Sequence, residues 1–88
     1  MSNQAFLARV YVSLKPTVND PQGITIASSL ESLGFEGVED VRSGRFMQVS
    51  LVAEDKSAAA TAVEEMCARV LANRVIEAYT FEVEDAER

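Results

Sequence analysis

The chain has 88 residues and a mass of 9.6 kDa, which is enough for one hydrophobic core and too little for two. Hydrophobic residues make up 48% of it and charged residues 25%, a balance typical of a globular domain and not of a disordered segment. Fourteen acidic residues against eight basic ones give a net charge of −6 and a pI near 4.5. That sign disfavours binding to a phosphate backbone, so no nucleic acid partner is expected.

The chain has no histidine and one cysteine, Cys67. These counts exclude zinc sites built from cysteine and histidine, catalytic triads that use histidine, and internal disulfides. The N-terminal residues lack the charged and apolar regions of a secretory signal, and no stretch approaches the ~20 apolar residues of a membrane span. We therefore expect a soluble cytoplasmic protein without a membrane partner.

Strand-like alternation comes first in the chain. From Phe6 to Leu14 every second residue is apolar, and two of the residues between them, Leu7 and Tyr11, are large and apolar as well. This alternation predicts a half-buried strand that Pro16 ends.

The next predicted element is a helix. Asp20-Pro21 is a helix start, because Asp20 can accept hydrogen bonds from the first-turn amides and proline loses no bond at that position. The helix carries one apolar face, and Gly34 is placed as its left-handed end. The residues on that face are Ile26, Leu30 and Leu33.

Two extended runs follow, at 38–41 and 46–53, joined by Arg42-Ser43-Gly44-Arg45. This spacing predicts a hairpin whose glycine lies at a position that tolerates a positive φ.

A second helix is predicted from Asp55 or Ser57 to Asn73, where asparagine can adopt the left-handed conformation. Its apolar stripe consists of Val63, Met66, Cys67, Val70 and Leu71. Alternation over 78–84 then predicts a last strand that runs into an acidic tail at about 84–88.

The predicted order is βαββαβ, the ferredoxin-like α+β fold, with two helices on one face of an antiparallel sheet. Residues 1–88 form its one domain. The opposite face of the sheet would carry large apolar side chains that neither helix covers, which predicts self-association through that face. These side chains are Leu7, Tyr11, Phe46 and Val52.

The residues with chemical potential have structural explanations. Cys67 lies on the apolar stripe with no histidine to activate it, so we expect a buried, inert thiol. The acidic pairs show no spacing that singles out a general acid and base, and no catalytic, cofactor or metal residue is assigned. Lys15, Arg42 and Arg45 could meet an anion at the helix start, but Asp20 already occupies those amides and repels an anion. A structural turn is therefore favoured there.

Four segments together resemble the PurS family, the small subunit of phosphoribosylformylglycinamidine synthase. They are LKPTVNDPQG at 14–23, LESLGF at 30–35, VRSGR at 41–45 and LANRVIE at 71–77. Each is weak alone, and their shared order and spacing make the resemblance specific. The chain departs from the family at Arg45, where lysine is usual, and at Arg74, where proline is usual.

The resemblance implies a required subunit that is not catalytic itself, in a complex of de novo purine biosynthesis. The complex converts formylglycinamide ribonucleotide, ATP and glutamine to formylglycinamidine ribonucleotide. In the family a glutaminase subunit releases ammonia and a synthetase subunit holds ATP and Mg²⁺. The small subunit is expected to bridge the two as a homodimer or homotetramer, to assist ammonia transfer, and to bind no cofactor itself.

The motif positions are the expected subunit contacts: Lys15, Asp20, Gln22, Gly23, Arg42, Gly44, Asn73 and Glu77. For Asp20, Gly23, Gly44 and Asn73 the alternative is that they are only caps and turns. The competing function is a stand-alone dimeric regulatory domain that holds a small effector between protomers.

Overall fold

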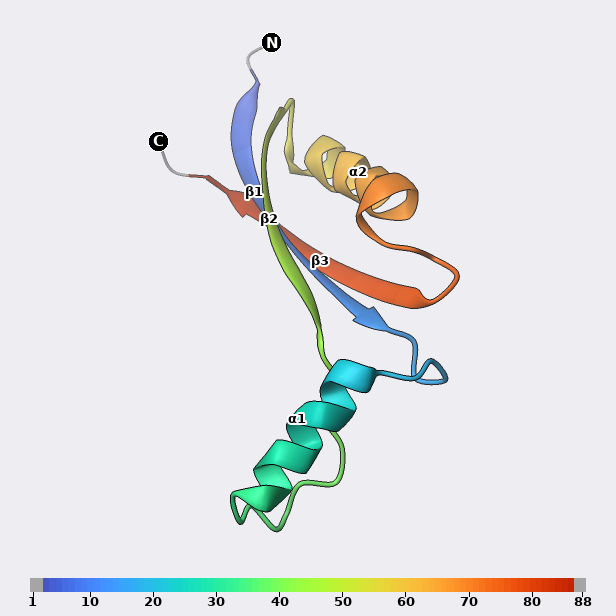
Figure 1. The fold of residues 1–88 in the computed structure, drawn as a ribbon. Helices are drawn as coiled ribbons and strands as arrows, with labels where there is room; N and C mark the ends of the chain where they lie inside the picture. Colours follow the sequence, from blue (N-terminus) through green and yellow to red (C-terminus); the bar gives the residue numbers. More distant parts are fainter. Residues whose placement is uncertain (1–2, 87–88) are drawn as a thin grey trace.

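The computed structural model describes residues 3–86 (Figure 1). Its elements are β1 (Gln4–Leu14), α1 (Pro21–Ser32), β2 (Gly44–Ala53), α2 (Lys56–Met66), the π-helical turn η1 (Cys67–Leu71) and β3 (Glu77–Asp85). The strands form one antiparallel sheet in the order β2-β1-β3. The fold is therefore α+β, with the antiparallel sheet and the two helices that the sequence predicts.

The core lies between the sheet and α2, and the alternation in β1 builds half of it. Phe6, Ala8, Val10 and Val12 are at most 2% exposed and face α2. From the helix, Ala59, Val63 and Cys67 are fully buried. The predicted inward face of β1 and the burial of Cys67 are thus confirmed.

Helix α1 begins and ends where the sequence predicts. The carboxylate of Asp20 accepts a hydrogen bond of 2.9 Å from the backbone N–H of Gly23, and Pro21 occupies the first helical position. Beyond the helix, Gly34 has a φ of 96°, a conformation that side chains other than glycine rarely adopt.

The direction of α1 differs from the prediction. Instead of packing beside α2, the helix projects away from the sheet, and the chain returns along it before entering β2 (Figure 1). Gly23 is the only residue of α1 that is buried. Only α2 covers the inner face of the sheet, so the prediction of two helices on one face is wrong for a single copy of the chain.

The predicted strand at 38–41 is also absent, so the sheet has three strands rather than the four of a βαββαβ order. These residues belong to the projecting segment, where no neighbouring strand lies within pairing distance, and an isolated extended run has no ladder to join. The predicted hairpin is absent as well, because its first strand does not form. Gly44 is instead the first residue of β2, pairs with Ser13, and does not have a positive φ.

Two further boundaries differ. Among residues 3–86 no residue other than glycine has a positive φ, so Asn73 does not end its helix in a left-handed conformation. The helix instead loosens into η1 and ends at Ala72, which is extended. Of the predicted acidic tail, Glu84 and Asp85 lie in β3, and Glu87 and Arg88 lie outside the described residues.

Candidate functional site

The outer face of the sheet, opposite α2, carries all four side chains predicted to lie there. In the register of the sheet, Tyr11 is opposite Phe46 and Val52 is opposite Ala5. Ala5 directly precedes Phe6, which faces the core, so Ala5 and Val52 lie on the outer face. Tyr11, Phe46 and Val52 are 43%, 53% and 56% exposed. The structure therefore leaves a row of exposed apolar groups on this face.

Polar contacts divide that row. The guanidinium of Arg9 forms an ion pair with Glu84 between the position of Leu7 and that of Tyr11. The rings of Tyr11 and Phe46 lie 5.2 Å apart between centroids, tilted by 33°, a favourable aromatic geometry. The tyrosine hydroxyl also reaches Glu82, at 3.5 Å.

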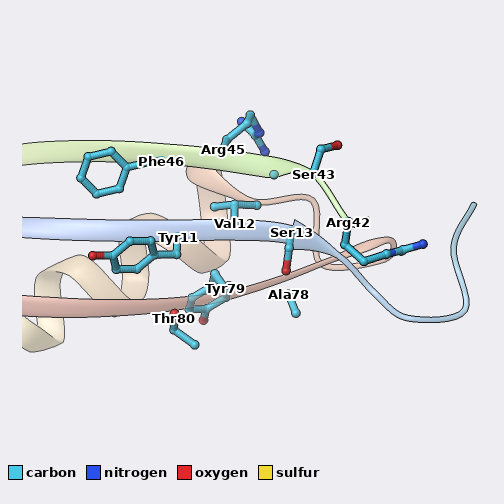
Figure 2. A pocket seen from close by; sticks show the side chains of 11 residues that line it. Tyr11, Val12, Ser13, Arg42, Ser43, Arg45, Phe46, Ala78, Tyr79 and Thr80 are labelled. Carbon is cyan, nitrogen blue, oxygen red and sulfur yellow. The ribbon is translucent and has the colours of Figure 1, made fainter. Parts of the chain in front are cut away.

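A hollow of about 360 Å³ lies at the end of this face where β1 leads toward α1. Figure 2 shows Tyr11 and Phe46 on neighbouring strands, with Ser13 and Arg42 further along toward the strand ends. Here the predicted self-association face meets Arg42 and Gly44, two of the predicted subunit contacts.

Next to the hollow, both ends of the projecting segment are fastened to each other. We call residues 21–41 the arm. Asp20, at the start of the arm, is 2% exposed. Its carboxylate accepts hydrogen bonds from the backbone N–H of Ser43, at 2.6 Å, and from the Ser43 hydroxyl, at 3.0 Å, in addition to the bond from Gly23.

Arg42 makes a second connection at the same place. Its Nη2 donates to the carbonyl oxygens of Lys15, at 3.0 Å, and Val18, at 2.8 Å. The loop after β1 is thus tied to the residue that precedes Ser43. Gly23 completes the junction, because a Cβ at this position would lie 2.1 Å from the carbonyl oxygen of Val41.

A third set of bonds lies at the start of β3. Glu77 accepts hydrogen bonds from the backbone N–H of Asn73, at 2.7 Å, and from Arg45, at 2.8 Å. Arg45 also donates to the carbonyl oxygen of Leu71, at 3.2 Å. The guanidinium therefore fastens the end of η1 to the start of β3.

The two carboxylates respond to these donors in the same way. Backbone hydrogen bonds from Gly23 and Ser43 lower the pKa of Asp20, and the Arg42 charge adds to the effect. The backbone hydrogen bond from Asn73, followed by the bond from Arg45, lowers the pKa of Glu77. Both groups are held in their charged form.

The predicted subunit contacts are therefore neighbours in space, although they come from three separate segments of the chain. A second hollow, of about 400 Å³, is lined by Asp20, Gln22, Gly44 and Glu77, with Ser43 and Arg45 among its other residues. Asp20 and Gly23 are buried there, and their atoms shape the junction. Lys15 enters the junction through its backbone carbonyl.

Sequence reasoning missed Ser43, which donates to Asp20 through both its backbone and its hydroxyl. Its position between Arg42 and Gly44 suggested only a turn. The exposure of the arm was missed as well, since an amphipathic pattern in the sequence does not show where its apolar face is covered.

Two further groups with a shifted pKa, Cys67 and Tyr79, lie on the core side of the sheet. Burial raises the pKa of the Cys67 thiol, and the hydroxyl of Tyr79 donates to Glu64, which raises the pKa of the tyrosine. Across residues 3–86 there is no group of three or more histidine, cysteine, aspartate or glutamate residues arranged to hold a metal ion. Within the same range, the helices are too short or too polar to cross a membrane.

Comparison with known proteins gives one family. The model of the family "PurS: Phosphoribosylformylglycinamidine (FGAM) synthase" matches residues 7–85. The phosphoribosylformylglycinamidine synthase subunit PurS of Bacillus subtilis is 42% identical over 80 residues, which are 91% of this chain and 94% of that protein.

Two solved structures have the same fold. PurS of Methanocaldococcus jannaschii, described as one of the subunits of formylglycinamide ribonucleotide amidotransferase in the purine biosynthetic pathway, superimposes with a TM-score of 0.81 at 36% identity. It matches 93% of this chain and 99% of its own. A chain of PurLQS from Thermotoga maritima gives 0.80 at 30% identity, covering 93% of this chain and 98% of that one. The chain with the arm and junction described above therefore belongs to the PurS family.

Proposed function

We propose that this chain is an accessory subunit of phosphoribosylformylglycinamidine synthase, itself without catalytic residues, that bridges the glutaminase and synthetase subunits. In this role it assists the transfer of ammonia for the conversion of formylglycinamide ribonucleotide, with ATP and glutamine, to formylglycinamidine ribonucleotide. ATP and Mg²⁺ belong to the synthetase subunit. Family membership supports the reaction, and the shape of the chain supports the bridging role.

The observation that carries the bridging role is the large uncovered surface. The chain exposes 6346 Å², whereas a compact monomer of this mass exposes about 5,100 Å². Its radius of gyration is 17.0 Å, against about 12 Å for a compact domain of this length. A chain whose elements point apart and carry exposed apolar groups on more than one side is suited to contact several subunits at once.

Within the assembly we assign the outer sheet face to self-association. Tyr11 and Phe46 form its centre, with Leu7 and Val52 further along the same face. The junction at the base of the arm, with Gln22, Arg42, Gly44, Asn73 and Glu77 at its surface, is the proposed contact with the other subunits. Gln22, Arg42 and Asn73 are the exposed side chains of that set.

Assembly is the direct test of bridging. The cognate glutaminase and synthetase subunits are mixed with and without this chain and examined by sedimentation velocity in the presence of glutamine and ATP. We expect one fast-sedimenting complex that contains all three chains, and separate subunits when this chain is left out. A complex of equal size that forms without it would overturn the bridging role.

A further inference from the structure

The turn that leads into β3 carries the most exposed large apolar side chain among residues 3–86. We call residues 73–76 the β3 turn. Its Val75 is 81% exposed, and the neighbouring Ile76 is 38% exposed. Figure 1 shows this turn at the edge of the molecule, between α2 and the start of β3 and apart from the arm. Neither residue belongs to the outer sheet face, whose centre is Tyr11 and Phe46.

Hydrogen bonds within the chain fix the shape of the β3 turn. The carbonyl oxygen of Asn73 accepts from the backbone N–H of Ile76, at 3.1 Å, and of Glu77, at 2.7 Å. The side-chain oxygen of Asn73 accepts from the backbone N–H of Val75, at 3.1 Å. The backbone N–H of Asn73 donates to the carboxylate of Glu77, which Arg45 holds from the other side. The turn therefore takes its shape without a partner, and Val75 stands on a preformed support.

The charge near the β3 turn is opposite in sign to that of the whole chain. Although the net charge is −6, three stretches contain six basic residues and no acidic one: residues 1–19, 41–53 and 66–76. All three meet at the turn. The backbone N–H of Lys15 donates to the carbonyl oxygen of Ile76, at 2.8 Å, and Arg45 bonds to both ends of the segment 71–77. The fold therefore gathers basic residues from separate parts of the chain at this place.

Two of these cations have no carboxylate partner within the described part of the chain. Lys15 and Arg74 take part in none of the ion pairs formed among residues 3–86. The acidic residue next to the turn, Glu77, is paired with Arg45, and only 15% of its side chain is exposed. The exposed charge beside Val75 is therefore positive, although most of the chain is acidic.

We infer that the β3 turn docks on another subunit of the complex, where Val75 enters an apolar pocket and carboxylates at the rim meet Lys15 and Arg74. An apolar centre with a charged rim is the usual anatomy of a protein interface. Because the turn is preformed, docking orders little that was free before. The turn also continues the junction surface, through Asn73 and Glu77. The inference rests on the bridging function proposed above and adds the chemistry of the surface that the partner offers.

The test titrates this chain into a mixture of the cognate glutaminase and synthetase subunits, with glutamine and ATP, and follows the three-chain complex by sedimentation velocity. Val75→Glu places a carboxylate on the apolar centre of the turn. Its matched control is Val70→Glu, because Val70 is 79% exposed and lies on η1, outside the turn. Arg74→Glu reverses one unpaired charge. Lys56→Glu, at an exposed position at the start of α2, is the control for that reversal.

We expect Val75→Glu and Arg74→Glu each to weaken assembly by about tenfold or more, since a carboxylate would enter an apolar pocket or face other carboxylates. The two control variants should assemble like the wild type. Assembly of the wild type should also weaken as sodium chloride is raised from about 50 mM to about 300 mM, because salt screens the attraction between exposed charges. Arg74→Gln should reduce this dependence on salt.

Three results would overturn the docking of the turn. Normal assembly of both Val75→Glu and Arg74→Glu would reject it and leave the bridging function intact. Equal weakening by Val70→Glu would show that the contact is not confined to the turn. A wild type that forms no three-chain complex would reject the bridging function, and the docking of the turn with it.

The mass of this chain alone distinguishes another subunit from a second copy. Since the side chain of Val75 is exposed, Val75→Glu by itself should keep the far-UV circular dichroism and the mass of the wild type. A Val75→Glu chain that loses self-association would show that the turn docks on a second copy, which overturns the inference.

Amide hydrogen exchange of the wild type gives a measurement that does not depend on any variant. The amides of residues 73–77 should become more protected when the glutaminase and synthetase subunits are added with glutamine and ATP. Protection that stays the same in the complex would contradict the inference.

Discussion

Asp20 and Ser43, 23 positions apart in the sequence, are joined by two hydrogen bonds, from the Ser43 backbone N–H and from its hydroxyl to one buried carboxylate. The first residue precedes the arm and the second follows it. This pair therefore fastens the two ends of the arm to each other at the place where α1 leaves the sheet.

Removing the carboxylate should disturb the arm more than removing the hydroxyl. Asp20→Ala takes away the acceptor for Gly23 and for both donors of Ser43, whereas Ser43→Ala removes only the hydroxyl bonds. We expect Asp20→Ala to lower the urea midpoint of unfolding further than Ser43→Ala does. Equal midpoints for the two variants would contradict the role given to the buried carboxylate.

Stability should fall at acid pH. The pKa values of Asp20 and Glu77 are lowered in the folded chain, so the folded state binds protons less readily than the unfolded state, whose carboxyl pKa values are near 4. The stabilisation is complete above about pH 4 and is lost as the pH falls through the lower, folded values.

Urea titrations between pH 7 and pH 2 measure this dependence. The urea midpoint should change little from pH 7 to pH 5 and should decrease once the pH is below about 4. In the double variant Asp20→Asn with Glu77→Gln this decrease should be less steep. If the urea midpoint of the double variant depends on pH as steeply as that of the wild type, carboxylates other than Asp20 and Glu77 control the loss of stability in acid.

Gly23 should not tolerate a methyl group. The Cβ of alanine would lie 2.1 Å from the carbonyl oxygen of Val41 and 2.9 Å from the carboxylate of Asp20. Overpacking of this kind costs about 1–3 kcal/mol of unfolding free energy. Gly37→Ala is the control: nothing lies within 4 Å of its added Cβ, and a change within about 0.5 kcal/mol is expected. Equal effects of the two substitutions would refute the close approach at Gly23.

The residue-level features that the sequence reveals are those set by neighbours along the chain. Alternation identified the buried face of β1, and the order Asp20-Pro21 identified the start of α1, because both patterns depend on local geometry. Val38–Val41 also has a local preference for an extended conformation, but a strand requires a partner that this segment does not have in one copy of the chain.

The junction could be predicted only in part. The family motifs marked Asp20, Arg42 and Glu77, yet they did not show that Asp20 is bonded to Ser43 or that Glu77 accepts a hydrogen bond from the backbone N–H of Asn73. Those bonds join residues whose separation in space is set by the whole fold. For the same reason the exposure of α1 could not be inferred from its amphipathic pattern.

A charge in the middle of the outer sheet face should break the contact assigned to it. Phe46→Glu places a carboxylate beside Tyr11, close to the acidic side chain of Glu82. We expect a smaller assembly in size-exclusion chromatography with light scattering, at unchanged far-UV circular dichroism. Thr61→Glu, an equally charged change at an exposed position of α2, should have no effect. A Phe46→Glu assembly of wild-type mass would remove the outer face from self-association.

Cys67 should report folding and take no part in function. Its thiol is fully buried and its pKa is raised by burial, so the reactive thiolate is scarce and inaccessible. Alkylation by iodoacetamide at pH 8 should be slow in the native protein and fast in 6 M guanidinium chloride. Cys67→Ala should leave activity of the reconstituted complex unchanged while lowering stability. Rapid labelling of the native protein would contradict the burial.

We propose that this chain assists the transfer of ammonia between two other subunits and supplies no catalytic group. The most direct measurement is the conversion of formylglycinamide ribonucleotide by the cognate glutaminase and synthetase, with and without this chain, using either glutamine or ammonium chloride as the nitrogen source. We predict that leaving the chain out abolishes the glutamine reaction and preserves the ammonium reaction. Full glutamine-dependent activity in its absence would contradict the account.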